Sequence, residues 1–127
     1  MSTILVAEDN EDLRYIIKDN LQKDGHTVIE ACDGVEVSDL LANNSVDVLI
    51  TDIVMPVQVG IETIIQIRKT YPRLPIIGIS GGGPLGGPDY YLGKAEFAGA
   101  DAVLSKPFSS ITLRQSVDEM LTFKVST

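Results

Sequence analysis

Five positions in this chain of 127 residues carry side chains suited to binding cations and phosphate. Glu8 and Asp9 form an acidic pair, and they are followed much later by Asp52, Ser80 and Lys106. Each comes directly after a short apolar run. Carboxylates bind hard cations, while a hydroxyl and an ammonium can stabilise a phosphoryl group. Because the five positions are far apart in the sequence, a fold must bring them together before they can act.

The apolar runs before these positions do not alternate with polar residues, which is typical of strands covered on both faces. They occupy residues 4–6, 28–29, 48–50, 76–79 and 102–104. Between them, apolar residues recur at helical spacing. These residues are Leu13, Ile16, Ile17 and Leu21, then Val37, Leu40 and Leu41, then Ile61, Ile64 and Ile65 with Arg68, and finally Leu113, Val117, Met120 and Leu121. A further helix over residues 89–98 is expected to be short or mobile, because Gly93 interrupts it.

A strand followed by a helix, repeated five times, predicts an α/β fold. Right-handed crossovers convert this repeat into a doubly wound parallel sheet with helices on both faces. The flavodoxin-like order 2-1-3-4-5 suits five strands, and ligands then bind where the order reverses, outside the carboxyl ends of strands one and three. We therefore expect a three-layer (βα)5 sandwich whose crevice is lined by all five positions. Residues 1–127 are expected to form a single domain, since a chain of this length fits one core.

Three carboxylates in such a crevice need positive charge beside them. At a separation of a few ångströms each pair repels by about 4 kcal/mol at an effective dielectric of about 20. Lys106 supplies one positive charge, and Mg²⁺ is the natural second because it prefers hard oxygen ligands. We expect Asp9 and Asp52 to ligate Mg²⁺, Glu8 to hold metal-bound water, and the backbone carbonyl of Val54 to complete the shell.

Asp52 is the best candidate for a nucleophile, because it is central in the strand order. A carboxylate held beside a metal ion and an ammonium stays ionised and can attack phosphorus, giving an aspartyl phosphate. Lys106 would then pair with one phosphate oxygen, and Ser80 would donate a hydrogen bond to another. The sequence predicts a magnesium-dependent phosphoryl acceptor.

The composition narrows the classes of partner. Ten Lys and Arg against eighteen Asp and Glu give a net charge of −8, which disfavours direct binding of nucleic acid or anionic lipid. No apolar segment approaches the roughly 20 residues that span a bilayer, and the start of the chain lacks a signal-peptide pattern. The single Cys32 cannot form an internal disulfide and is expected to be a small buried residue. We expect a cytoplasmic protein with no membrane insertion.

Together these motifs resemble the receiver domain of bacterial two-component response regulators, over essentially the whole chain. The resemblance rests on Glu8-Asp9, on Asp52-Ile-Val-Met-Pro56 with Gly60, on Ser80, and on Lys106-Pro107-Phe108, in that order. It implies that Asp52 accepts a phosphoryl group, with Mg²⁺, from a phosphohistidine of a sensor histidine kinase or a phosphotransfer protein. It also implies no activity beyond this transfer and self-dephosphorylation, and a cis Lys106-Pro107 bond.

We expect a stand-alone, chemotaxis-regulator-like receiver that changes its binding to a downstream protein target. Two features depart from the receiver pattern: Val103 stands where receivers often carry Tyr or Phe, and the loop from Gly81 to Gly87 is long and rich in glycine. Both suggest an atypical output. Two alternatives stay open, a phosphate-independent interaction module on the same fold and a small flavin-binding or nucleotide-binding protein. The second is suggested by the G-x-G-x-x-G spacing at residues 81–86.

Overall fold

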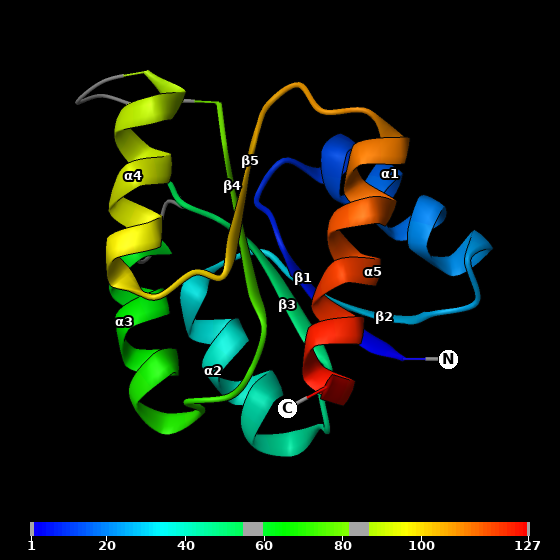
Figure 1. Ribbon diagram of the computed structural model, residues 1–127, viewed down its shortest axis with the longest axis horizontal. Coiled ribbons are helices and arrows are strands. Elements are labelled where there is room, and N and C mark those ends of the chain that lie inside the picture. Colours follow the sequence, from blue (N-terminus) through cyan, green and yellow to red (C-terminus); the bar gives the residue numbers. More distant parts are fainter. Residues whose placement is uncertain (1, 55–59, 82–86, 127) are drawn as a thin grey trace.

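The computed structural model of the chain describes residues 2–54, 60–81 and 87–126. In these residues five strands alternate with five helices, as the sequence predicts (Figure 1). The strands are β1 (Thr3–Ala7), β2 (Thr27–Ala31), β3 (Val48–Asp52), β4 (Ile76–Ser80) and β5 (Ala102–Ser105). The helices are α1 (Glu11–Lys23), α2 (Gly34–Asn43), α3 (Gly60–Thr70), α4 (Pro88–Ala98) and α5 (Ser110–Ser126).

The strands form one parallel sheet in the order β2-β1-β3-β4-β5. Helices α1 and α5 cover one face of this sheet, while α2, α3 and α4 cover the other (Figure 1). This is the predicted flavodoxin-like three-layer sandwich. No helix in the described ranges is long and apolar enough to cross a bilayer.

The core consists of two apolar layers, because successive side chains of a strand point to opposite faces. Ile4 and Val6 of β1 pack towards α1 and α5, while Leu5 and Ala7 pack towards α2 and α3. Every residue of β3 and β4 is buried. Burial of each large aliphatic side chain contributes about 1.5–3 kcal/mol, and this fixes the strands whose ends carry the polar residues.

Polar residues define the helix ends. The Asn10 side chain accepts a hydrogen bond from the backbone N–H of Leu13 at 3.0 Å and so caps the start of α1. Gly25 follows the same helix with φ of +90°, a conformation that favours glycine. Asp33 caps α2 in the same way, since its side chain accepts a hydrogen bond from the N–H of Glu36 at 2.9 Å.

The buried faces of α1 and α3 differ in part from the sequence expectation. Ile16 is 54% exposed and Ile65 is 39% exposed, although both were placed on buried faces. Ile67, which the pattern did not include, is only 3% exposed. Runs such as Ile16-Ile17 and Ile64-Ile65 put two apolar residues next to each other on a helix, and only one of each pair can face the sheet.

The fourth helix is longer than the sequence suggested. We expected a short or mobile element over residues 89–98, but α4 is continuous over eleven residues. A methyl group added at Gly93 would meet nothing within 4 Å, so this glycine is not needed for packing. Pro88 stands in the first turn of the helix, where its missing N–H costs little. The propensity penalty of one glycine, about 1 kcal/mol, is too small to break a helix that packs on the sheet.

Arg68 joins three segments at the amino-terminal edge of the sheet. Its Nη2 donates to Gly99 O and to Asp101 Oδ2, both at 2.8 Å, and its Nε donates to Gly99 O at 3.1 Å. Asp101 Oδ2 also accepts from the backbone N–H of Ile76 at 2.9 Å. Nη1 donates to the carbonyls of Tyr71, Pro72 and Leu74 at 3.4, 3.0 and 2.8 Å. One guanidinium therefore connects the end of α3 with the segments before β4 and β5.

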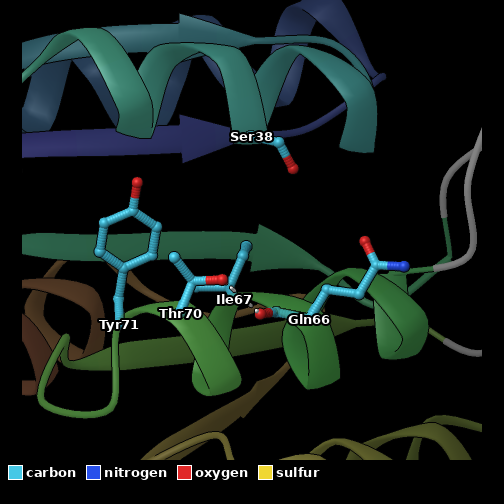
Figure 2. A pocket seen from close by; sticks show the side chains of 5 residues that line it. All are labelled: Ser38, Gln66, Ile67, Thr70 and Tyr71. Atoms are coloured by element: carbon cyan, nitrogen blue, oxygen red, sulfur yellow. Dashed lines mark hydrogen bonds between the residues drawn. The ribbon is translucent and has the colours of Figure 1, made fainter.

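A pocket of about 170 Å³ lies between α2 and α3. Ser38 projects into it from α2, while the α3 side and Tyr71 supply the opposite wall (Figure 2). The remaining lining residues are Gln66, Ile67 and Thr70. None of the five positions with candidate chemistry contributes to it, so the pocket is separate from them.

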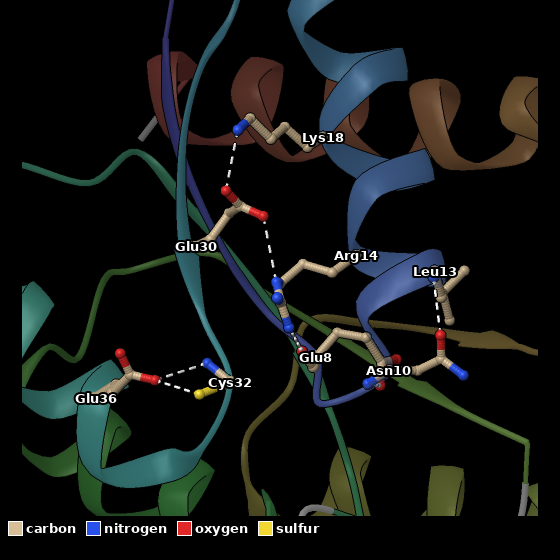
Figure 3. Close-up of polar contacts among 8 residues, drawn as sticks. All are labelled: Glu8, Asn10, Leu13, Arg14, Lys18, Glu30, Cys32 and Glu36. Atoms are coloured by element: carbon tan, nitrogen blue, oxygen red, sulfur yellow. Dashed lines mark hydrogen bonds and ion pairs between the residues drawn. The ribbon is translucent and has the colours of Figure 1, made fainter.

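The expectation that Cys32 is a buried apolar residue is wrong. Cys32 is exposed, and its Sγ lies 2.6 Å from Glu36 Oε1, which also accepts the backbone N–H of Cys32 at 3.0 Å (Figure 3). The thiol follows the last residue of β2, where the chain has already left the sheet. The hydrogen bond to the Glu36 carboxylate raises the pKa of the Cys32 thiol, with a smaller contribution from burial.

Substitution Arg68→Met should lower the free energy of unfolding by about 2 kcal/mol, because several partly buried acceptors lose their donor together. Chemical denaturation of both proteins measures this change. Lys69→Met is the matched control, since Lys69 is exposed, and it should change stability by no more than about 0.5 kcal/mol. Equal effects of the two substitutions would contradict the joining role of Arg68.

The raised pKa of Cys32 should make this exposed thiol react slowly, because only the thiolate attacks alkylating agents. Iodoacetamide alkylation followed by mass spectrometry over pH 7–10 should therefore show a midpoint above that of a free cysteine. Glu36→Gln removes the negative charge, so it should lower the midpoint and speed alkylation at pH 8 several-fold. Glu119→Gln on α5 serves as the control and should match the wild type. An unchanged rate in Glu36→Gln would refute the explanation.

Candidate functional site

The carboxyl ends of four strands bring the predicted residues to one edge of the sheet. Glu8 comes directly after β1, Asp52 is the last residue of β3, Ser80 is the last residue of β4, and Lys106 comes directly after β5. Strand pairing places β1 beside β3, β3 beside β4 and β4 beside β5. The polar groups therefore meet where the strand order reverses, as expected for this topology.

The Lys106 ammonium lies between two buried acids. Its Nζ is 2.6 Å from Asp52 Oδ2 and 2.7 Å from Glu8 Oε1. The contact with Asp52 has hydrogen-bond geometry, whereas the contact with Glu8 is an ion pair by distance alone. The Glu8 side chain has no exposed surface and that of Asp52 is 6% exposed, while Lys106 retains 24%. Two buried carboxylates thus share a single cation.

Asp52 is held through both of its oxygens. Oδ2 binds Lys106, and Oδ1 accepts the backbone N–H of Val54 at 2.9 Å. The next residue, Ile53, continues the pairing with β4 by donating to Ile79 O at 2.9 Å. The carboxylate orientation is therefore fixed by the sheet and by the turn that follows β3.

The acidic pair sits in the turn between β1 and α1. The N–H of Glu8 donates to Ala31 O at 3.1 Å, and Glu8 Oε2 accepts the N–H of Asn10 at 3.1 Å. Asp9 is exposed, and within the described part of the chain no hydrogen bond or ion pair holds its side chain. One carboxylate oxygen each from Glu8, Asp9 and Asp52 lie within 4.8 Å of one another. This spacing brings three hard ligands to one point.

Ser80 and Lys106 are connected through the backbone. Ser80 is fully buried and pairs in register with Ser105, and the N–H of Lys106 donates to Ser80 O at 2.9 Å. The Lys106-Pro107 peptide bond is cis, as the resemblance implies. A backbone hydrogen bond therefore joins the end of β4 directly to the segment that carries the lysine.

The electrostatics of the site follow from burial and from these ion pairs. Burial raises the pKa of Glu8 to about 7; the Lys106 ammonium opposes this shift, and the nearby charge of Asp52 adds to it. Burial alone would lower the pKa of Lys106, but its hydrogen bond to Asp52 and its ion pair with Glu8 outweigh burial and raise it. Lys106 thus stays charged, and the acids around it retain more negative charge than one ammonium can offset.

Some sequence predictions fall outside the described residues. These are Met55 and Pro56 in the motif after Asp52, together with residues 82–86 of the glycine-rich loop. Val103 is partly buried against the core. One residue that sequence reasoning missed is Arg14, whose Nη1 donates to Glu8 O at 2.7 Å. The sequence feature that could have revealed this contact is the position of Arg14, one helical turn after Asn10, the residue that caps the helix following the acidic pair.

Known proteins resemble this chain in sequence over most of its length. The family described as the response regulator receiver domain matches residues 4–118. The chemotaxis protein CheY homolog of Campylobacter jejuni is 38% identical over 127 aligned residues, which cover 93% of this chain and 91% of that protein. The transcriptional regulatory protein CpxR of Escherichia coli is 37% identical over 109 residues, covering 86% of this chain but only 44% of CpxR.

The fold agrees equally well with solved structures. The receiver domain of the Francisella response regulator 1452 superposes with a TM-score of 0.85 at 28% identity, covering 97% of this chain and 98% of that one. CheY4 of Vibrio cholerae gives a TM-score of 0.84 at 28% identity, with coverage of 95% and 99%. Taken with the family match, the sheet order and the acidic edge, these likenesses show that the chain belongs to the response regulator receiver domain family.

Proposed function

We propose that this receiver is a phosphorylation-dependent signalling switch whose phosphoryl acceptor is Asp52. The observation that carries the proposal is the position of the Asp52 carboxylate, which lies 2.6 Å from the Lys106 ammonium and beside the acids of Glu8 and Asp9. A carboxylate in such a cluster is both oriented and charged, which a nucleophile requires.

The donor set of the site fits Mg²⁺. Its three carboxylates come from two strand ends, their oxygens lie within 4.8 Å of one another, and Asp9 is open to solvent. Hard oxygen ligands with room for water and phosphate suit Mg²⁺ better than softer metals. In the proposal Asp9 and Asp52 ligate the ion, Glu8 holds its bound water, and the Val54 carbonyl contributes another ligand. When bound, Mg²⁺ would neutralise charge on the transferring phosphoryl oxygens.

In phosphoryl transfer the protein mainly positions the reactants, and the covalent change is confined to one bond formed and one bond broken. An oxygen of Asp52 forms the new O–P bond while the N–P bond of the donor phosphohistidine breaks, and the electron pair of that bond remains on the imidazole. The Lys106 ammonium is within reach of Asp52 and can pair with a phosphoryl oxygen as negative charge moves onto the acceptor. The Ser80 hydroxyl is proposed to donate to another oxygen.

Phosphorylation would change the balance of charge at the sheet edge. An acyl phosphate carries about 1.5–2 negative charges where the Asp52 carboxylate carried one, and its oxygens compete with Glu8 for Lys106. Because the N–H of Lys106 is bonded to Ser80 O, the ends of β4 and β5 must respond together. The proposed outcome is a population shift in the face formed by α4, β5 and α5, and Val103 makes a smaller contribution than an aromatic residue would.

The proposed donors are a sensor histidine kinase or a phosphotransfer protein, and the output is altered binding to a protein target. A net charge of −8 argues against direct contact with nucleic acid. Kinase-dependent signalling of this kind fits a cytoplasmic protein with no turnover of an external substrate.

Substitution Asp52→Asn should abolish labelling, because an amide oxygen is a poor nucleophile and carries no charge. The test incubates purified protein with phosphoramidate and Mg²⁺ and measures the intact mass. Wild type and the control Asp39→Asn, an exposed change on α2, should each gain one phosphoryl group. Labelling of Asp52→Asn at the wild-type rate would refute the assignment of the acceptor.

Substitution Asp9→Asn should weaken Mg²⁺ binding by about tenfold or more, because a charged ligand is lost. Calorimetric titration of the unphosphorylated protein measures the affinity directly. Asp12→Asn makes the same chemical change in the exposed first turn of α1 and should alter the affinity by no more than about twofold. If both variants bind Mg²⁺ as wild type does, Asp9 is not a ligand.

A further inference from the structure

Arg14 is fixed between the acidic turn and strand β2. It lies in α1, its side chain is 17% exposed, and its Nη1 donates to the backbone carbonyl of Glu8 at 2.7 Å (Figure 3). Its Nε donates to Glu30 Oε1 at 3.2 Å. The planar guanidinium thus uses two different nitrogens for two partners, which a lysine could not do in the same way.

Glu30 is in turn held in place by a second cation. It belongs to β2 and pairs in register with Val6 of β1, and its Oε2 accepts from Lys18 Nζ at 3.0 Å (Figure 3). The hydrogen bond to Lys18, followed by that to Arg14, lowers the pKa of Glu30, so this carboxylate is ionised at neutral pH. Arg14 therefore rests against an anchored negative charge.

The carbonyl that Arg14 binds belongs to the peptide unit leading into Asp9. A peptide unit is planar, so the position of the Glu8 oxygen also fixes the N and Cα atoms of Asp9. The N–H of Glu8 is already bound to Ala31 O at 3.1 Å. The backbone is consequently held by β2 on one side and by Arg14 on the other.

Asp9 depends on this backbone support, because no hydrogen bond or ion pair holds its side chain within the part of the chain that the structure describes. Glu8 and Asp52 differ, since each has Lys106 as a direct partner. We infer that Arg14, oriented by Glu30, is a positioning residue that holds the Glu8-Asp9 peptide and thereby places the Asp9 carboxylate for Mg²⁺. This inference rests on the proposed function.

A positioning role for Arg14 and a purely electrostatic role predict opposite changes in Mg²⁺ affinity when the residue is removed. If Arg14 acted only through its positive charge, its removal would strengthen the binding of a cation. If it holds the turn, its removal should weaken Mg²⁺ binding, and loss of a supporting residue behind a ligand costs about tenfold in affinity. The direction of the change therefore separates the two explanations.

The test measures the Mg²⁺ affinity of the unphosphorylated full chain by calorimetry, with urea unfolding of each variant to establish that it is folded. Arg14→Ala should bind about tenfold more weakly. Arg14→Lys retains the positive charge but not the planar guanidinium that donates to Glu8 O and Glu30 at once, so it should also lose Mg²⁺ affinity several-fold. Glu30→Ala should weaken binding in the same direction, because Arg14 then loses its anchor.

Lys23→Ala is the matched control, since Lys23 is a cation of the same helix that pairs with Asp19 at 3.0 Å and not with Glu30. Its affinity for Mg²⁺ should stay within about twofold of wild type. Folded Arg14→Ala or Glu30→Ala with unchanged or stronger Mg²⁺ binding, or a loss in Lys23→Ala equal to that in Arg14→Ala, would overturn the positioning role. Absence of Mg²⁺ binding by the wild type would instead overturn the proposed function, and the inference with it.

Discussion

The contact of one ammonium with two buried carboxylates is the interaction on which the site depends. Glu8 and Asp52 have almost no exposed surface, and each lies within 2.7 Å of Lys106 Nζ. Two such acids repel by about 4 kcal/mol at an effective dielectric of about 20 when both are charged, and a cation between them offsets this repulsion. One lysine does not balance these two acids and Asp9. The unmatched negative charge makes this edge of the sheet compatible with the binding of a second cation.

The two edges of the sheet differ in how their charged side chains are paired. At the amino-terminal edge, Arg68 joins the end of α3 to Gly99 and Asp101 through neutral and ionic hydrogen bonds that satisfy the backbone. At the carboxyl-terminal edge, Glu8, Asp9 and Asp52 lie close enough to repel one another, and in the described residues no hydrogen bond or ion pair holds the Asp9 side chain. The extensive hydrogen bonding of Arg68 thus lies at the opposite edge of the sheet from the cluster of acids. Arg14 and Glu30 extend rigid support to the acidic turn without occupying the site itself.

The sequence was sufficient to predict the strand order and the meeting of Asp52 with Lys106, because apolar runs locate the strands and parallel topology fixes where their ends lie. It was insufficient wherever the outcome depends on which way one side chain points. Cys32 looked like a core residue, yet it lies just past the end of β2 and bonds to Glu36. The Arg14–Glu30 pair depends on how α1 packs on β2, which no spacing within the chain reveals.

The most direct test of the central claim is a crystal structure of the protein with Mg²⁺ and beryllium trifluoride, an analogue of the phosphoryl group. The proposed site predicts beryllium bonded to an Asp52 oxygen, Mg²⁺ beside Asp9 and Asp52, and the Lys106 ammonium moved from Glu8 onto a fluorine. A structure in which Asp52 stays unmodified at saturating reagent, with Lys106 still between the two acids, would contradict it.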